Sequence, residues 1–402
     1  MDALIRDVLR NAKESPMRAM LALTSEPGMI SLAGGHPDPN LLPRDWLVEM
    51  AHVELDKLIC RDLQYGPTEG LPSLRESVCA VLADRHIQAQ PNEVAITTGS
   101  QQGMSLVAQV ILEPGDAVAM APFNFPASIQ AVRYAGGQVL TLPGEGEGLG
   151  ELARSARRPI KAVYLVPSFA NPTAHVMPLG ARLRLLEDAV RHGILVIEDD
   201  PYGELWFDRP PPDSLYALNQ AGQMGAAVVY LTSFSKTVMP ALRLGALAAP
   251  PAIRRAVVLA KQAGDVHTGL LEQRFLDAML RSGRLAGHLN SIREAYKAKA
   301  QAMTETLRQC ADALLFFAAP SGGMFVWGAL QGSARGASAT DWFAFGRKHR
   351  VLVVPGHALS ADGDGTEFLR LSFANPGVAD IREGVKRLAA GLVAETRSAS
   401  PA

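Results

Sequence analysis

Short apolar runs alternate with longer segments of helical pattern through the middle of the chain. Each run has five to seven residues, which suits a strand that is buried on both faces. The runs are residues 94–98, 117–121, 138–142, 161–166, 194–198, 226–232 and 245–249. Segments between them, such as 101–112 and 179–192, have apolar residues at helical spacing and stop at glycine-containing turns. This alternation predicts an α/β fold with a doubly wound, mostly parallel sheet of seven strands.

The C-terminal part of the chain has a different pattern. A long polar helix is expected over residues 292–312. Short strands are expected after it, at residues 323–328, 351–355 and 368–373. A long helix followed by short strands favours a smaller α+β unit over a continuation of the parallel sheet.

Chain length supports two domains. The 402 residues exceed the size of about 300 residues at which single cores stop growing. The large domain is predicted over residues 60–290, which contain the seven apolar runs. The smaller α+β domain takes residues 31–59 and 291–402, and residues 1–30 form an N-terminal arm.

Composition narrows the possible partners. Hydrophobic residues make up 48% and charged residues 20% of the chain, as in ordinary globular proteins. The 39 basic and 40 acidic residues give a formal net charge of −1, without the basic excess that nucleic-acid binding requires. No apolar stretch is long enough to span a bilayer, and the start lacks the pattern of a secretory signal. We therefore expect small-molecule partners, with neither nucleic acid nor membrane.

Cysteines and histidines indicate neither a disulfide framework nor a metal site. Cys60, Cys79 and Cys310 are scattered and odd in number, which fits a reducing compartment. The nine histidines lack an H-E-x-x-H or comparable ligand spacing, so no catalytic metal is expected. A cytoplasmic location is the expectation.

One lysine lies among residues that suggest covalent chemistry. Lys236 follows Ser233 and Ser235, and Arg243 comes seven positions later. Neighbouring positive charge lowers the pKa of a lysine, so that its free amine can attack a carbonyl. Two serines and an arginine suit a phosphate. Together they indicate a phosphate-bearing aldehyde held as a Schiff base, as in pyridoxal phosphate, although a polar turn would explain the same residues.

Other candidate residues follow the apolar runs, at the sheet edge where ligands bind in open α/β folds. The turn with Ser100 and Gln101 can hold a phosphate at a helix N-terminus. Phe125 can stack on a flat ring, and Asn171 can donate to a phenolate oxygen. A carboxylate of the segment 198–200 can pair with a pyridine nitrogen. Each residue alone also fits helix capping, turn formation or core packing.

With these residues in order, the chain resembles the pyridoxal-phosphate-dependent aminotransferases of fold type I, class I/II, from about Arg18 to Phe373. It is most similar to the branch of 2-aminoadipate and kynurenine aminotransferases. The motifs that carry the resemblance are Met29-Ile-Ser-Leu-Ala-Gly-Gly35-His-Pro37, Leu63-Gln-Tyr65-Gly-Pro-Thr-Glu-Gly70, Thr98-Gly-Ser-Gln-Gln102, Asn171-Pro-Thr173, Glu198-Asp-Asp-Pro-Tyr202 and Ser233-Phe-Ser-Lys236.

The resemblance implies roles toward the cofactor. Lys236 would form the Schiff base and carry the proton between the α-carbon and the cofactor. Asp199 would hold the pyridinium nitrogen, and Asn171 and Tyr202 would bond the phenolate oxygen. The residues expected to bind the phosphate are Ser100, Gln101, Ser233, Ser235 and Arg243. Tyr65 would reach the phosphate of a neighbouring subunit, which implies a homodimer with shared active sites.

The resemblance also implies a substrate site. Arg370 would clamp the substrate α-carboxylate with both ends of its guanidinium, and Gly35 would let the backbone close over the substrate. Arg18 would lie near the substrate side chain, which favours an acidic or aromatic amino donor with 2-oxoglutarate as acceptor. A surface arginine on an amphipathic arm would explain Arg18 equally well.

One segment departs from the family pattern. Asn124 stands where the family usually has an aromatic residue, and the segment is one residue longer. Phe125 is the expected stacking ring, with Phe123 as the alternative. This departure leaves open which ring covers the cofactor.

The predicted function is ping-pong exchange of an amino group between an L-amino acid and a 2-oxo acid. Elimination, decarboxylation or oxidation on the same cofactor is an alternative, because site geometry selects among the carbanions that pyridoxal phosphate stabilises. A non-catalytic effector module of a transcription regulator is a second alternative, but it needs a DNA-binding segment upstream of the motif that begins at Ile30.

Overall fold

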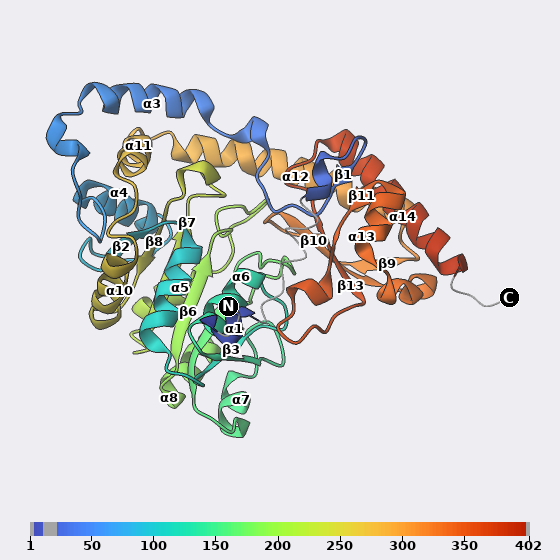
Figure 1. The fold of residues 1–402 in the computed structure, drawn as a ribbon, viewed down its shortest axis with the longest axis horizontal. Coiled ribbons are helices and arrows are strands. Elements are labelled where there is room, and N and C mark those ends of the chain that lie inside the picture. Colours follow the sequence, from blue (N-terminus) through green and yellow to red (C-terminus); the bar gives the residue numbers. More distant parts are fainter. Residues whose placement is uncertain (1–3, 11–21, 399–402) are drawn as a thin grey trace.

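The computed structural model describes residues 4–10 and 22–398. Its elements form two groups, one around a seven-stranded sheet and one around a four-stranded sheet (Figure 1). A short helix, α1 (Asp7–Arg10), precedes both. The long helix α12 (Leu285–Cys310) runs from the first group to the second (Figure 1). None of the helices in the described ranges is long and apolar enough to cross a membrane.

The seven-stranded sheet has the order β2-β8-β7-β6-β5-β3-β4. Its strands are β2 (Val94–Thr97), β3 (Ala117–Met120), β4 (Gln138–Thr141), β5 (Ile160–Leu165), β6 (Leu195–Asp200), β7 (Val228–Ser233) and β8 (Gly245–Ala248). All neighbours are parallel except β8, which runs antiparallel to β2 and β7. Each strand falls within two residues of a predicted apolar run, so the predicted α/β fold with a mostly parallel sheet is confirmed.

Helices cover both faces of this sheet. They are α3 (Arg44–Asp56), α4 (Pro72–Ala83), α5 (Ser100–Ile111), α6 (Pro126–Tyr134), α7 (Leu149–Ser155), α8 (Leu179–His192), α9 (Leu215–Ala221), α10 (Pro251–Gly264) and α11 (Leu270–Arg281). Alternate residues of a strand point to opposite faces. On β6, Ile197 belongs to the core shared with α5, α6 and α10, whereas Val196 belongs to the core shared with α4, α8, α9 and α11. The apolar runs are continuous because both faces are buried.

The second group is built on an antiparallel sheet of order β12-β13-β10-β9. Its strands are β9 (Leu315–Phe317), β10 (Phe325–Leu330), β12 (Val354–Pro355) and β13 (Phe368–Ser372). Helix α12 packs here with α14 (Val378–Ser398), and α13 (Trp342–His349) packs beside α14. Helix α12 begins seven residues before the predicted start at 292, because residues 285–291 continue the helix despite their polar pattern.

The apolar run 351–355 forms two strands instead of the one predicted. β11 (Val351–Leu352) pairs in parallel with β1 (Ile30–Ser31), whereas β12 pairs with β13. The partner strands β1 and β13 are far apart in the sequence. The apolar run alone therefore could not show that it divides between two sheets.

The N-terminal segment 30–40 therefore lies against the second group. Besides the β1–β11 pairing, the buried Lys299 of α12 pairs with Asp38 at 2.5 Å and donates to Ala374 O at 2.9 Å. Helix α3, which follows this segment, packs beside α11, and its Trp46 lies in the core of the large sheet. The predicted domain boundaries at residues 30, 59 and 290 stay a prediction.

Candidate active site

A cavity of about 350 Å³ lies at the carboxyl ends of β5, β6 and β7. Residues 33–36 and the strands β12 and β13 of the second group form its other wall. Twelve of the residues predicted from the sequence line it together. They are Gly35, Ser100, Gln101, Phe125, Asn171, Asp199, Tyr202, Ser233, Ser235, Lys236, Arg243 and Arg370.

One predicted residue, Tyr65, does not line this cavity. Tyr65 is 83% exposed, and its ring meets His267 edge to face at 5.9 Å on the surface. Arg18 lies outside the described residues.

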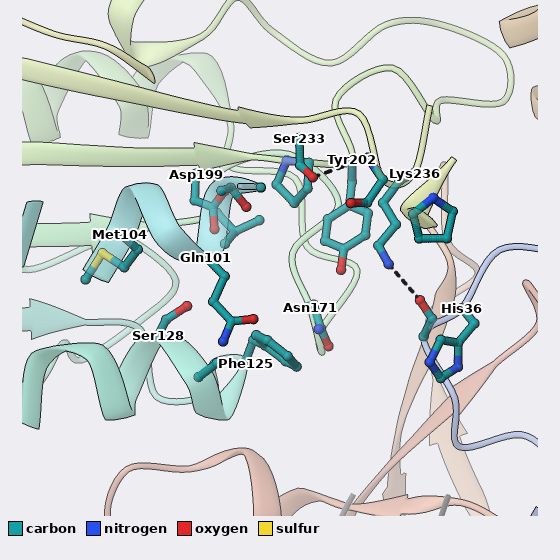
Figure 2. Close-up of a pocket in the computed structure, with 18 of the residues that line it drawn as sticks. His36, Gln101, Met104, Phe125, Ser128, Asn171, Asp199, Tyr202, Ser233 and Lys236 are labelled. Atoms are coloured by element: carbon teal, nitrogen blue, oxygen red, sulfur yellow. Dashed lines mark hydrogen bonds between the residues drawn. The ribbon is translucent and has the colours of Figure 1, made fainter. Parts of the chain in front are cut away.

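Lys236 stands just past the end of β7 with its amine in the cavity. Its Nζ donates to Gly35 O at 3.0 Å, beside His36 (Figure 2). Burial lowers the pKa of Lys236 to about 8, and the positive charges of Arg243 and Arg370 act in the same direction. No carboxylate pairs with Lys236 in the described part of the chain, so the amine can lose its proton near neutral pH.

Asp199 faces the cavity because it lies on the same side of β6 as Ile197. Its Oδ2 accepts a hydrogen bond from the Tyr164 hydroxyl at 2.8 Å, whereas the buried Oδ1 has no partner among the described residues. Burial raises the pKa of Asp199 to about 6, and the hydrogen bond from Tyr164 opposes that rise. A buried acceptor without a partner is costly unless a ligand satisfies it.

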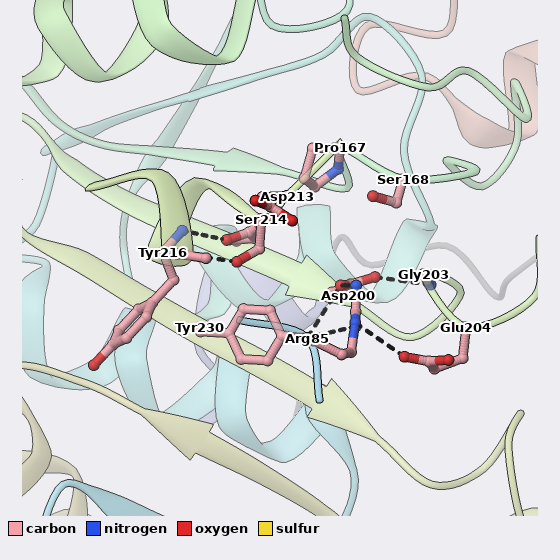
Figure 3. Close-up of polar contacts among 12 residues, drawn as sticks. Arg85, Pro167, Ser168, Asp200, Gly203, Glu204, Asp213, Ser214, Tyr216 and Tyr230 are labelled. Carbon is pink, nitrogen blue, oxygen red and sulfur yellow. Dashed lines mark hydrogen bonds and ion pairs between the residues drawn. The ribbon is translucent and has the colours of Figure 1, made fainter. Parts of the chain in front are cut away.

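The two acids beside Asp199 point to the opposite face of the sheet, because side chains alternate along β6. Figure 3 shows Asp200 with its partners Arg85 and Tyr230. Glu198 accepts from the backbone N–H groups of Leu215 and Tyr216, both at 2.9 Å, and so caps helix α9. Asp200 pairs with the half-buried Arg85 at 2.6 Å and accepts from the Tyr230 hydroxyl at 3.0 Å. Of the three acids, only Asp199 is therefore available in the cavity.

An anion cradle lies at the N-terminus of α5. Gly99 precedes the helix without a side-chain cap, so the first N–H groups of α5 are open toward the cavity. Ser233 and Ser235 line the same end, and Arg243 Nη1 lies 3.4 Å from Ser235 Oγ. A Cβ on Gly99 would come within 3.2 Å of Arg243 Nη2 and narrow the cradle. Backbone N–H groups, serine hydroxyls and an arginine guanidinium thus converge at this end of the cavity. All three kinds of donor bind phosphate.

The close approach of this turn to β8 requires a second glycine. A Cβ on Gly245 would lie 2.6 Å from Thr232 O and 2.9 Å from the backbone of Gly99. Contacts under 3.0 Å do not occur for real Cβ atoms, so only glycine permits this packing.

Arg370 is fully buried, and no carboxylate pairs with it in the described ranges. Its Nη1 donates to Asn171 Oδ1 at 2.7 Å and its Nη2 to Ala33 O at 2.6 Å, while the buried Nε has no partner. The Cζ atom lies 4.4 Å from the centre of the Phe325 ring. Burial lowers the pKa of Arg370 to about 10, which leaves it charged. A buried cation without a counter-ion is suited to bind an anionic ligand.

The loop that carries Asn171 is held by a buried arginine. Arg182 of α8 donates to Pro167 O at 2.7 Å and to Met177 O at 3.0 Å, so it ties both ends of the loop together. It also donates to Ser168 Oγ at 3.0 Å. These bonds fix the position of Asn171 relative to Arg370.

The two candidate stacking rings point in different directions. Phe125 lines the cavity. Phe123 packs against the rings of Trp327 and Phe368, with centres 4.9 and 5.2 Å apart, and does not line it. Asn124 between them is buried and donates to Ala121 O at 2.6 Å.

Some lining residues were not predicted from the sequence, notably Ser128, Tyr164 and His36. Tyr164 lies within the predicted strand 161–166 and has the appearance of a core residue. Strand alternation offered a signal, because Tyr164 shares a core with Ile197, on the Asp199 side of the sheet. In the described ranges, no group of three or more His, Cys, Asp or Glu residues is arranged to hold a metal ion.

The sequence profile of the family described as aminotransferase class I and II matches residues 30–388. The chain belongs to this family. A 2-aminoadipate transaminase of Thermus thermophilus is 40% identical over 384 residues, which are 94% of each chain. The predicted resemblance to this family and to its 2-aminoadipate and kynurenine aminotransferases is thereby confirmed.

Solved structures of this aminotransferase family share the fold. The α-aminoadipate aminotransferase LysN of Thermus thermophilus, complexed with N-(5′-phosphopyridoxyl)-L-leucine, superposes with a TM-score of 0.88 at 36% identity, covering 98% of each chain. A kynurenine aminotransferase of Pyrococcus horikoshii, in complex with PMP, gives a TM-score of 0.90 at 32% identity, again over 98% of each chain.

Proposed function

We propose that this aminotransferase uses pyridoxal phosphate to exchange an amino group between an acidic or aromatic L-amino acid and a 2-oxo acid such as 2-oxoglutarate. Membership of the aminotransferase family supports both the transamination reaction and the use of pyridoxal phosphate. The assignment of residues rests on one observation: the Lys236 amine and the unpartnered Asp199 Oδ1 share a cavity with an anion cradle. Elimination, decarboxylation and oxidation are not favoured, because the similar proteins are transaminases.

The cavity residues fit the parts of this cofactor. Asp199 Oδ1 is a buried acceptor suited to a protonated ring nitrogen. The α5 N-terminus, Ser233, Ser235 and Arg243 suit its phosphate. Asn171 and Tyr202, which line the cavity, would hold its phenolate oxygen, and Phe125 would pack on its ring face. When bound, pyridoxal phosphate supplies an aldehyde that takes up the amino group and a ring that withdraws electrons from the substrate.

Lys236 and Arg370 act on the substrate itself. The lowered pKa of Lys236 favours the free amine, which would hold the cofactor through its aldehyde carbon with loss of water. Once the substrate amine has displaced it, the Lys236 amine would take the proton from the substrate α-carbon. Arg370 binds the α-carboxylate in two hydrogen bonds, which fixes the direction of the α-carbon. Its contact with Asn171 keeps the guanidinium in place before substrate arrives.

Gly35 closes the cavity over the bound substrate. A Cβ at this position would come within 3.2 Å of Phe325 Cζ, in the ring that lies below the Arg370 guanidinium. A larger residue would push the 33–36 segment away from the cavity. The backbone carbonyl of Gly35 then would no longer reach the Lys236 amine.

The donor is proposed from the similar enzymes. One acts on 2-aminoadipate and another on kynurenine, which favours acidic or aromatic donors for this chain. Arg18 is the proposed contact for the substrate side chain, and it comes from the segment before residue 22. The three free cysteines support a cytoplasmic location.

We further propose a homodimer in which Tyr65 reaches the phosphate site of the other subunit. Tyr65, Leu63 and Ile59 are 83%, 65% and 54% exposed, which is unusual for large apolar side chains so close together. Tyr65 lies beside His267, and Thr268 Oγ1 is 3.4 Å from Thr98 Oγ1, next to the anion cradle. A partner that covers this surface would thus lie near the cofactor site.

A half-reaction screen tests the function. Each amino acid is added to the enzyme loaded with pyridoxal phosphate, the cofactor band is followed to the pyridoxamine form, and the 2-oxo acid is identified by mass. We expect conversion with acidic or aromatic donors and none in Lys236→Ala. Absence of conversion with every donor, or an eliminated or oxidised product, would refute transamination.

A further inference from the structure

A chain of three buried polar groups leads from α6 to the cavity carboxylate. Ser128 Oγ on α6 lies 2.8 Å from the Tyr164 hydroxyl on β5, and that hydroxyl lies 2.8 Å from Asp199 Oδ2 on β6. The three side chains are buried, Tyr164 almost completely at 1% exposure. All three line the cavity.

The chemistry of the groups sets the direction of the hydrogen bonds. An ionised carboxylate only accepts, so the Tyr164 proton is donated to Asp199. The Tyr164 oxygen then accepts from Ser128, whose hydroxyl proton is free to rotate toward it. Oδ2 of Asp199 is thereby occupied, and Oδ1 is left as the acceptor that opens into the cavity.

We propose that Ser128 and Tyr164 are positioning residues that hold Asp199 ionised, with Oδ1 directed at the ring nitrogen of the cofactor. This inference rests on the proposed function, in which Asp199 faces that nitrogen. Ser128 acts only through Tyr164, and Tyr164 acts only through Asp199. We call this chain of hydrogen bonds from Ser128 through Tyr164 to Asp199 the relay. It controls how strongly the ring nitrogen is held in its protonated form.

The charges around Asp199 explain why it needs this support. Burial and the nearby Asp200 raise the pKa of Asp199, while the hydrogen bond from Tyr164 lowers it. Arg85 pairs with Asp200 on the far face of the sheet. The pKa of Tyr164 lies well above its usual value because of burial and the nearby Asp199, so its hydroxyl remains a donor. Removing that donor would raise the pKa of Asp199 further.

The opposite face of the sheet offers a matched control. Tyr230 on β7 is also buried and donates to the neighbouring acid Asp200 at 3.0 Å. Both its hydroxyl and Asp200 lie outside the lining of the cavity. Tyr230→Phe therefore removes a buried hydroxyl from an equivalent strand position. It tests for the general effect of losing a tyrosine–aspartate hydrogen bond outside the cavity.

The experiment measures the Kd of pyridoxal phosphate for the apoenzyme as a function of pH, together with thermal stability. The variants are Tyr164→Phe, Ser128→Ala, the double variant and Tyr230→Phe. We expect about 10-fold weaker binding for Tyr164→Phe and about 3-fold weaker binding for Ser128→Ala. The double variant should match Tyr164→Phe, because Ser128 acts through Tyr164. The pH below which affinity is lost should rise in Tyr164→Phe.

Several results would overturn the relay. One is binding by Tyr164→Phe within two-fold of wild type, and another is an equal loss in Tyr230→Phe. Additive effects of the two relay substitutions would also do so. If Tyr164→Phe does not fold, Ser128→Ala decides alone: unchanged affinity and pH dependence refute the relay. Wild-type enzyme that neither binds the cofactor nor transaminates would instead refute the proposed function, and the relay with it.

Discussion

The amine of Lys236 donates a hydrogen bond to the carbonyl oxygen of Gly35 over 3.0 Å, although 201 positions separate the two residues. One comes from the end of β7 and the other from the N-terminal segment that pairs with the second group of elements. The amine therefore lies where the two halves of the cavity meet. A neutral carbonyl holds it, so its protonation depends on burial and on Arg243 and Arg370.

Uptake of pyridoxal phosphate by the apoenzyme should depend on pH through Lys236. Its pKa is lowered to about 8, so the nucleophilic amine is scarce below that pH and predominates above it. We expect the rate of uptake, followed by absorbance after rapid mixing, to rise with pH to a midpoint near 8. The stability of the apoenzyme should rise between about 8 and 10.5, because the unfolded chain binds the proton more tightly there. A midpoint near 10.5 would contradict the assignment.

Arg370→Lys should keep the charge but lose the two-point contact with the α-carboxylate. We expect kcat/KM for amino acids to fall about 100-fold, as when a buried charge pair is disrupted. Amines that lack a carboxylate should be affected far less, which steady-state kinetics on both substrate types can check. Arg347→Lys, at an exposed arginine paired with Glu26, is the matched control and should leave both rates unchanged. An equal loss for both types of substrate would contradict the clamp.

The large sheet could be predicted from the sequence because its strands are buried on both faces and are apolar throughout. Which strands pair with each other was harder to predict from the sequence. The run 351–355 divides between β1 and β13, and neither partner is indicated by the run itself. The start of α12 was missed because residues 285–291 have a polar pattern and are held in the helix by tertiary packing, as at the buried Leu289.

The site could be predicted where its residues are polar and follow a strand. Asp199 was assigned from the family pattern, and strand alternation supplies the physical reason why Glu198 and Asp200 face away. Tyr164 was missed because an aromatic residue within an apolar run is typical of a core. Its function depends on a neighbour in another strand, which a single sequence does not reveal.

Gly99→Ala should weaken cofactor binding specifically. Gly99 has φ of 80°, which an alanine adopts only with strain, and the new Cβ would lie 3.2 Å from Arg243 Nη2 in the anion cradle. We expect about 10-fold weaker binding of pyridoxal phosphate, measured by titration of the apoenzyme. Gly193→Ala is the control, since its φ is 64° and its Cβ would meet nothing within 4 Å. Both variants should lose stability, but a loss of affinity in Gly193→Ala would show that strain alone is responsible.

Tyr65 should act on the cavity of the partner subunit. Tyr65→Ala should bind pyridoxal phosphate weakly, and Lys236→Ala should be inactive, when each forms its own dimer. In a hybrid of the two, one site combines an intact Lys236 with an intact Tyr65 from the other chain. We expect that hybrid, purified with two different tags, to recover about half the activity of the wild-type dimer, as its two-fold arrangement requires.

The control for this complementation is a hybrid of Lys236→Ala with Arg243→Ala. Arg243 lines the same cavity as Lys236 of its own chain, so neither site of that hybrid is complete and no recovery is expected. Tyr65 is 83% exposed and absent from the lining of its own cavity, so its substitution should behave in the opposite way. Failure of the Tyr65 hybrid to recover would place Tyr65 in its own site or outside both, and a chain that is monomeric by light scattering would exclude sharing altogether.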